Sequence, residues 1–333
     1  MKHKTLEILL NNKNEYISGE DISQILKVSR TAVWKHITAL KKDGYVIEAS
    51  KSKGYKIANQ ESVMESAFYE LAEDQIIGRE YHYLKEVDST NTYAKSLAKE
   101  AKEGTVVISD LQTQGKGRLG RSWDSKSGQG IWMSVILKPE VSLTGIFILS
   151  HLAGASICKA LIDEGYDARI KWPNDVVVSG KKVCGILCEI DGEPERLNYV
   201  IVGMGINLKQ SLNDFPEEIR NKATSLELEL CQRNPNSISL KVDGKEILRK
   251  ILVNFDFFYK QLKSGNVEEI IYYTREHSAT IGKDVKLLYN NDTLLAKALD
   301  INNQGGLVIQ TEDGQTMEII SGEVSVRGIY DYI

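Results

Sequence analysis

Three glycines within residues 112–123 constrain the fold of this chain most, because their spacing is the Gly-x-Gly-x-x-Gly fingerprint of dinucleotide-binding folds. In those folds a strand precedes the glycines and a helix opens at the third one. A strand is predicted before this segment, over 105–111. Residues 124–130 then prolong the loop until a second strand, 131–137. The missing helix rejects a doubly wound dinucleotide-binding fold.

The same segment gathers positive charge around its glycines. Lys116, Arg118 and Arg121 would repel one another unless an anion lay between them. A nucleotide phosphate is such an anion, and glycine lets the backbone approach it closely. The segment therefore predicts a phosphate-binding loop.

Residues 1–58 are basic, although the chain as a whole carries a net charge of -4. They hold eleven Lys and Arg against six Asp and Glu, which gives +5 and leaves -9 for the rest of the chain. Ser18 is predicted to cap one helix and Ser29 the next. Val33 and Ile37 recur at helical spacing in the second of these helices. Two helices in such tight succession predict a helix-turn-helix.

The second of these helices and the hairpin after it carry the predicted DNA contacts. Two strands, 45–48 and 55–57, are joined by a lysine-containing turn and predict a wing. The alternative is a small helical interaction domain with a solvated polar face, which the local charge disfavours. The predicted DNA-binding residues are Ser29, Arg30, Thr31, Trp34, Lys35 and His36 on the helix, and Lys51 and Lys53 in the turn.

Four motifs, taken in order, resemble those of biotin–protein ligases. Residues 88–91 (Asp-Ser-Thr-Asn) resemble that family's Ser-Thr-Asn motif, and 115–123 resemble its glycine-rich signature loop. Residues 171–175 (Lys-Trp-Pro-Asn-Asp) and 182–187 (Lys-Val-Cys-Gly-Ile-Leu) resemble two further motifs of the family. With the basic N-terminal segment, the whole chain resembles the bifunctional ligases that also repress the biotin operon. Lys116 stands where an arginine is common.

The resemblance implies an ATP-dependent biotin–[acetyl-CoA-carboxylase] ligase. Biotin and ATP would give biotinyl-5'-AMP and pyrophosphate, and a lysine of a biotin carboxyl carrier domain would then take the biotin. Because the biotin carboxylate and the α-phosphate are both anions, fixed positive charge should carry most of the catalysis. The predicted catalytic residues are Lys182, Arg118 and Arg121.

The resemblance also implies two sets of binding residues, and a Mg²⁺ ion that arrives with ATP and is held by substrate oxygens rather than by a protein metal site. Asp175 ranks below the asparagines because it could simply make a turn. The predicted biotin-binding residues are Ser89, Thr90, Asn91, Gln112, Gly115, Lys116, Gly117, Arg118, Trp123, Lys182 and Gly185. The predicted ATP-binding residues are Lys116, Arg118, Arg121, Asn174 and Asn207.

The pattern of elements predicts an α+β multidomain chain. Its parts are a winged helix-turn-helix domain over 1–60, a catalytic domain over 65–278 and a C-terminal domain over 279–333. Hairpins such as 175–190 predict a mixed, mostly antiparallel central sheet. The resemblance implies the sheet of class II aminoacyl-tRNA synthetases. Short strands separated by Asn, Asp and Gly turns predict a C-terminal SH3-like barrel beginning near 281, with strands over 285–289, 294–299, 307–311 and 317–321.

The location and partners follow partly from composition and partly from the resemblance. No stretch approaches about twenty apolar residues and no signal-peptide core opens the chain, so a cytoplasmic protein without a membrane partner is expected. The four cysteines lack metal-binding spacing. The resemblance implies a carrier domain, operator DNA and a homodimer with biotinyl-AMP as partners. A non-catalytic metabolite sensor and a lipoate ligase of related fold remain as alternatives.

Overall fold

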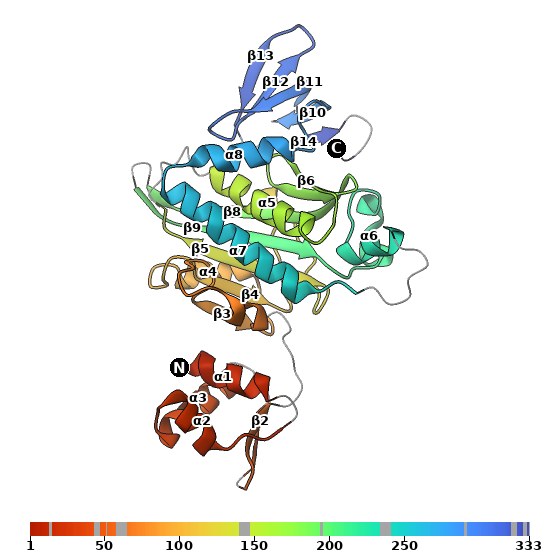
Figure 1. Ribbon diagram of the computed structural model, residues 1–333. Coiled ribbons are helices and arrows are strands. Elements are labelled where there is room, and N and C mark those ends of the chain that lie inside the picture. The colour runs from red at the N-terminus through yellow and green to blue at the C-terminus, as the bar shows by residue number, and fades with distance from the viewer. Residues whose placement is uncertain are drawn as a thin grey trace.

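The computed structural model describes residues 1–12, 15–42, 47–50, 52–57, 65–139, 147–193, 196–233, 241–289, 292–320, 325–328 and 332. Three groups of elements follow one another along the chain (Figure 1). No helix in these ranges is long and apolar enough to cross a membrane.

The N-terminal group contains α1 (Lys2–Asn11), α2 (Gly19–Leu26), α3 (Arg30–Lys42), and the antiparallel strands β1 (Ile47–Ser50) and β2 (Gly54–Ile57). These elements surround a hydrophobic core of their own. The predicted winged helix-turn-helix is therefore present. Its buried apolar residues are Leu6, Leu9, Ile22, Leu26, Val33, Ile37, Leu40, Ile47 and Ile57.

Both predicted helix caps are confirmed. The Ser18 hydroxyl accepts a hydrogen bond from the backbone N–H of Asp21 at 3.0 Å, and the Ser29 hydroxyl accepts one from Ala32 at 3.2 Å. Such caps satisfy backbone donors that the first helical turn leaves open. Residues 45 and 46 of the predicted first wing strand, and Lys51 in its turn, lie outside the described residues.

The central group is built on a seven-stranded sheet in the order β3-β4-β5-β9-β8-β7-β6. Only β3 and β4 pair in parallel, so the predicted mixed, mostly antiparallel sheet is correct. The strands are β3 (Tyr81–Leu84), β4 (Val106–Ser109), β5 (Gly130–Leu137), β6 (Ala168–Lys171), β7 (Asp175–Val178), β8 (Lys181–Glu193) and β9 (Arg196–Asn207).

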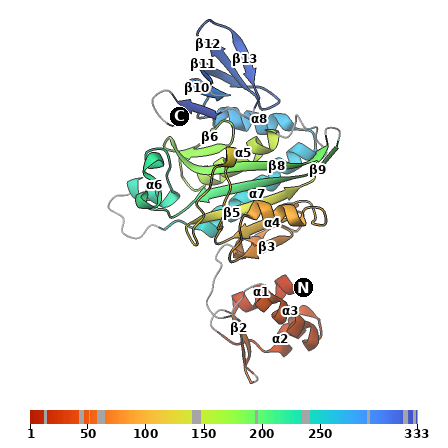
Figure 2. The same cartoon turned by 180° about the vertical axis from the view of Figure 1, so that it is seen from behind.

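Helices cover the two faces of this sheet unequally. α5 (Phe147–Ile162) and α7 (Gly244–Lys263) lie across one face, with α8 (Val267–Glu276) packed against both of them (Figure 1). α4 (Thr90–Leu97) lies on the opposite face (Figure 2). Alternate residues of β9 therefore enter different cores, since its even positions join the core of α5 and α7 and its odd positions 199 and 201 join that of α4. The α4 face has room left for a site.

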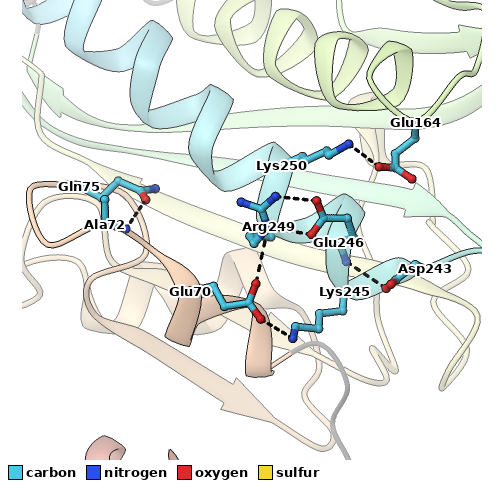
Figure 3. Close-up of polar contacts among 9 residues, drawn as sticks. All are labelled: Glu70, Ala72, Gln75, Glu164, Asp243, Lys245, Glu246, Arg249 and Lys250. Atoms are coloured by element: carbon cyan, nitrogen blue, oxygen red, sulfur yellow. Dashed lines mark hydrogen bonds and ion pairs between the residues drawn. The ribbon is translucent and has the colours of Figure 1, made fainter.

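Ion pairs fasten the start of α7 to neighbouring segments (Figure 3). Glu70 of the short helix η1 (Glu65–Glu70) pairs with Lys245 at 2.6 Å and with Arg249 at 3.7 Å. Lys250 pairs with Glu164, which follows α5. Partly exposed pairs of this kind contribute at most about 1 kcal/mol each. The buried face of α7 is therefore the main support of its position.

The C-terminal group is a five-stranded antiparallel sheet in the order β13-β12-β11-β10-β14. The sequence predicted the first four of these strands but not the fifth. Buried residues of β10, β11 and β12 belong to the same hydrophobic cluster as the central core. The strands are β10 (Asp284–Tyr289), β11 (Asp292–Ile301), β12 (Leu307–Thr311), β13 (Thr316–Ile319) and β14 (Ser325–Gly328).

Candidate functional site

A cavity of about 360 Å³ opens on the sheet, and its lining comes from segments far apart in the sequence. The segments are the start of α4, the loop 116–123, the junction of β6 and β7, strands β8 and β9, residues 219–223 and Tyr332. A cavity of this size suits a small-molecule ligand. Residues from all four motifs that resemble those of biotin–protein ligases line this cavity.

Glycines on adjacent strands hollow the floor of the cavity. Gly185 of β8 stands directly opposite Gly205 of β9. A Cβ atom on Gly205 would lie 2.4 Å from Nε1 of Trp123, and one on Gly185 would lie 2.9 Å from the same indole ring. The two glycines therefore make the space that the indole fills. Gly205 was not predicted as a site residue.

A hydrogen-bond network holds the polar end of the cavity. Gln112 Oε1 accepts from the backbone N–H of Thr90 at 2.8 Å and from its hydroxyl at 3.0 Å. The Gln112 amide donates to Ser125 at 2.8 Å, and Ser134 Oγ lies 2.7 Å from Thr90 Oγ1. Ser89 is the N-cap residue of α4 by its backbone, but its side chain makes no capping bond. The Ser89 hydroxyl is therefore not used as a helix cap.

Asn91 is held from three sides. Its amide donates to Glu189 at 2.7 Å, and its Oδ1 accepts from Ser134 at 2.6 Å. A Cβ atom on Gly203 would lie 2.1 Å from that oxygen, so only glycine fits at this position. Burial raises the pKa of Glu189, but hydrogen bonds from Asn91 and Lys95 outweigh burial and hold the pKa below its ordinary value. A charged Glu189 thus orients Asn91.

Two cations of the glycine-rich loop donate hydrogen bonds to neighbouring segments. Lys116 donates to Thr92 of α4 at 2.8 Å, and Arg118 donates to Asn174 Oδ1 at 2.9 Å. Burial lowers the pKa of the Arg118 guanidinium, while Asp175 acts in the opposite direction. An arginine nevertheless remains charged in a protein. The loop therefore presents a half-buried permanent cation to the cavity.

Gly115 serves packing rather than ligand approach. A Cβ atom at this position would lie 2.3 Å from the carbonyl oxygen of Trp123 and 2.7 Å from Ser125 Oγ. Gly115 is also absent from the lining of the cavity, unlike Gly117. Its expected role in biotin binding stays a prediction that acts through the shape of the loop.

Lys182 and Asp175 form an ion pair in the cavity wall, with Nζ 2.6 Å from Oδ1. A β-bulge between β7 and β8 falls beside Lys182, and bulges re-aim side chains. Tyr332 donates to the other oxygen, Oδ2, at 2.5 Å. Burial raises the pKa of Asp175, but Lys182, Lys171 and the Tyr332 hydroxyl together hold it below its ordinary value. The carboxylate is therefore charged at neutral pH.

The lining of the cavity is strongly cationic. Among the described residues that line it, Asp175 is the one carboxylate. A surplus of positive charge in a partly enclosed site favours a ligand with several negative charges. The cations that line the cavity are Lys116, Arg118, Arg121, Lys171, Lys182 and Lys222.

Asn207, like Gly115, is a predicted site residue that does not line this cavity. It ends β9 as expected, but it is not among the lining residues. Its amide donates to the carbonyl of Thr224 at 3.1 Å, and its Oδ1 accepts from Gln210 at 3.0 Å. Its expected contact with ATP stays a prediction, and these bonds give it a role in the fold. Asn174, by contrast, lines the cavity.

The predicted DNA-binding side chains that the structure describes are exposed, except that of His36, which is partly buried. Trp34 is 57% exposed, and Lys35 and Lys53 are exposed as well. Arg30 is exposed and lies 3.5 Å from Glu20. His36 instead contacts Thr5 of α1 at 3.0 Å, and burial lowers its pKa. Among the described residues predicted to bind DNA, His36 is therefore the least exposed.

Sequence reasoning missed several residues of the cavity. Asp175 was ranked below the asparagines, although its place in the Lys-Trp-Pro-Asn-Asp motif was a usable signal. Lys171 is buried in the same motif, with its ammonium 3.3 Å from the centre of the Tyr332 ring. Tyr332 carries no motif, and Lys222 lies in a segment without one. Neither residue had a sequence signal.

Comparison with family models defines the class of protein to which this fold and site belong. The model of the biotin/lipoate A/B protein ligase family matches residues 83–207. An HTH domain model matches residues 2–56, and the biotin protein ligase C-terminal domain matches 280–327. These matches define a protein ligase of the biotin and lipoate type with a helix-turn-helix domain.

Individual proteins narrow that class. The bifunctional ligase/repressor BirA of Bacillus subtilis is 36% identical over 317 residues, which cover 94% of this chain and 95% of that protein. BirA of Escherichia coli is 26% identical over 326 residues, covering 97% and 96%. A biotin protein ligase from Aquifex aeolicus, solved with biotin and ATP, has a TM-score of 0.62 at 34% identity and covers 75% of this chain and 99% of its own. The chain belongs to the biotin protein ligase family, among the bifunctional ligase/repressors.

Proposed function

We propose that this chain joins biotin to ATP as biotinyl-5'-AMP, transfers biotin to a lysine of a biotin carboxyl carrier domain, and represses biotin genes with the adenylate as corepressor. The main support for the ligase function is the cavity, which has one uncharged hydrogen-bonding end and one cationic end. Six cations and one carboxylate line it, together with the uncharged hydrogen-bonding groups of residues 89–91 and Gln112. Such a cavity matches a neutral ring system joined to a phosphate.

Biotin binding would use the uncharged end. Ser89, Thr90 and Asn91 are each nearly buried and held by the start of α4, so they can offer hydrogen bonds to a ureido ring at small entropic cost. Trp123 lies over the floor made by Gly185 and Gly205 and would cover the apolar part of biotin. The pre-formed network on Gln112 supports this end of the cavity as a specific pocket.

Adenylation would take place at the cationic end. A carboxylate oxygen of biotin attacks the α-phosphorus of ATP, and the bond from that phosphorus to the pyrophosphate oxygen breaks. Both reactants are anions, so Arg118 and Lys182 would act by neutralising charge and aligning the two groups. In the second step the amine of the acceptor lysine attacks the acyl carbon and AMP leaves. No side chain needs to act as a nucleophile.

Magnesium would accompany ATP rather than occupy a protein site. Among the described residues no three His, Cys, Asp or Glu side chains gather in a way that could hold a metal ion. Mg²⁺ commonly binds through one or two carboxylates together with substrate phosphates and water. Asp175 is the carboxylate in the cavity, and Lys182 already holds it. The ion would therefore be held by phosphate oxygens and water.

The proposal also includes the type of the central sheet, the type of the C-terminal domain and the domain boundaries. We assign the central sheet to the class II aminoacyl-tRNA synthetase type and the five C-terminal strands to an SH3-like barrel. The proposed domains are 1–60, 65–278 and 279–333. The separate hydrophobic core of the N-terminal elements supports the first boundary. The other two parts share one hydrophobic core, so the second boundary follows the change from the seven-stranded to the five-stranded sheet.

A turnover assay tests the ligase function. The chain is incubated with biotin, ATP, Mg²⁺ and a biotin carboxyl carrier domain, and pyrophosphate release and carrier mass are followed. Both products are expected in equal amounts. Biotin binding without either product would support a metabolite sensor instead. Lipoate in place of biotin is expected to give neither product, and faster turnover with lipoate would overturn the assignment of the acid.

A further inference from the structure

The C-terminal part of the chain contacts the wall of the cavity at several points, two of which involve Gly305 and Tyr332. The carbonyl of Gly305, in the turn between β11 and β12, accepts a hydrogen bond from Trp172 Nε1 at 3.0 Å. The same carbonyl lies 2.9 Å from Nε2 of the buried His151. The second contact is the bond from the Tyr332 hydroxyl to Asp175. Trp172 and Asp175 belong to one motif, so the C-terminal part holds both ends of it.

Tyr332 contacts two charged groups at once. Its hydroxyl donates to Asp175 Oδ2, while its ring lies beneath the Lys171 ammonium. Tyr332 is 9% exposed and Lys171 is 2% exposed, so both contacts are shielded from water. Charge-assisted hydrogen bonds and cation–π contacts are stronger when desolvated. One side chain therefore fixes a carboxylate and an ammonium together.

The geometry divides the oxygens of Asp175 between two partners. Oδ1 faces Lys182 at 2.6 Å, and Oδ2 receives the Tyr332 hydroxyl. Without the hydroxyl the carboxylate would be free to turn and to present either oxygen to Lys182. Lys182 is the cation that must reach the biotin carboxylate, so a change in its closest partner alters where its charge lies.

We propose that Tyr332 is a positioning residue for adenylation, which fixes Asp175 through its hydroxyl and Lys171 through its ring and thereby holds Lys182 where the two reacting anions meet. The inference rests on the proposed ligase function. It makes the C-terminal part of the chain a component of the active site. The chemical step itself is unchanged, and Tyr332 acts on it through Asp175 and Lys171.

Two variants separate the two contacts. Tyr332→Phe removes the hydroxyl and keeps the ring beneath Lys171, whereas Tyr332→Leu removes both. Tyr332→Phe is expected to lower kcat for biotinyl-AMP formation about tenfold, because a hydrogen bond to a charged group is lost. Its KM for ATP should change little. Tyr332→Leu should lower kcat further and also raise the KM for ATP, since Lys171 loses its support.

The pH profile supplies a readout that a merely structural role would not move. The groups that act on Asp175 are Lys182 and Cys184 from β8, Lys171 from β6, Arg118 from the loop, and Tyr332. The hydroxyl of Tyr332 favours the charged carboxylate, so its removal raises the pKa of Asp175. The acid limb of kcat against pH should therefore move to higher pH in Tyr332→Phe.

The matched control is Tyr272→Phe, which removes a hydroxyl from a side chain that is 61% exposed on α8. It is expected to leave kcat, KM and the acid limb unchanged. A Tyr332→Phe enzyme with the kcat and acid limb of the unmutated enzyme would overturn the inference. A lower thermal midpoint together with unchanged kcat per folded molecule would do the same. If the unmutated chain forms no biotinyl-AMP, the proposed function fails, which is a different result.

Discussion

The indole Nε1 of Trp123 lies 2.4 Å from the point that a Cβ atom on Gly205 would occupy. Glycine is therefore the one residue that lets β9 run beneath this tryptophan. Because Gly185 stands opposite on β8, the floor of the cavity depends on a pair of glycines in register. The cavity and the central sheet thus share a single packing constraint.

Gly205→Ala should displace Trp123 and weaken biotin binding. Inserting a methyl group into a packed site costs about 1–3 kcal/mol, so the affinity for biotin should fall about tenfold or more in calorimetric titrations. Gly154→Ala in α5 is the matched control, because the added Cβ would make only an ordinary contact, 3.5 Å from Ile170 of β6. Equal biotin affinities in the two variants would contradict the role of the glycine floor.

Arg118→Ala should impair both the formation and the retention of biotinyl-AMP. The phosphate loses a charge-assisted partner, which typically costs about 1.5–3 kcal/mol. Single-turnover adenylation and filter retention of labelled adenylate measure the two effects. Arg169→Ala serves as the control, because that arginine is exposed and pairs only with Asp167 among the ion pairs of the described residues. The phosphate-loop assignment fails if Arg118→Ala matches this control.

His151 should make the stability of the chain depend on pH. Burial lowers the pKa of His151, against the Gly305 carbonyl, which acts in the opposite direction. The folded chain then binds fewer protons here than the unfolded chain, so this contribution is complete above about pH 6.5 and is lost as the pH falls from there toward the folded pKa. Urea unfolding from pH 8 to pH 5 should show a steeper fall than in His151→Gln. If the unfolding free energies of the unmutated chain and of His151→Gln fall in parallel with pH, the lowered pKa of His151 is refuted.

Removing residues 1–58 should abolish operator binding. Lys51→Ala together with Lys53→Ala should weaken binding to all DNA sequences alike and reduce its salt dependence, because lysines of a wing contact phosphates. Arg30 and Lys35 should affect sequence discrimination more strongly. Titrations at several salt concentrations measure these effects, with Lys286→Ala, an exposed lysine of β10, as the control. An unchanged affinity after truncation would remove the DNA-binding assignment.

Biotinyl-AMP should tighten self-association and operator binding more than biotin alone does. A single winged domain makes few phosphate contacts, so two heads on a two-fold operator would gain affinity from effective concentration. The adenylate is expected to promote that homodimer, and carrier protein is expected to oppose it by consuming the adenylate. Sedimentation and DNA titrations with each ligand check this. Identical constants with and without adenylate would leave the ligase uncoupled from its DNA-binding domain.

The sequence singled out four motifs, and residues of all four line one cavity, although their binding roles stay predictions. Ser18 and Ser29 marked helix starts through their capping chemistry. The composition around residues 88–91 marks the start of α4 less clearly, and the helix begins at Thr90 and ends at Leu97. Its start depends on Ser89, whose extended backbone forms the N-cap without a side-chain bond.

Other parts of the site depend on register and on distant contacts, which a single sequence does not reveal. Gly203 and Gly205 are ordinary glycines in a strand until the pairing with β8 and the places of Asn91 and Trp123 are known. Tyr332 reaches Asp175 across 157 residues of sequence. The ion pair of Asp175 with Lys182 depends on a β-bulge between their strands. A single sequence does not reveal that bulge, so the motif alone also allows Asp175 to be a turn residue.

Exchange of labelled pyrophosphate into ATP tests the central claim most directly, because it reports the first chemical step without a carrier protein. The exchange is expected to require biotin and to be reduced strongly in both Arg118→Ala and Lys182→Ala. Exchange without biotin, or none in its presence under conditions where biotin and ATP both bind, would contradict the assignment of this cavity to biotin adenylation.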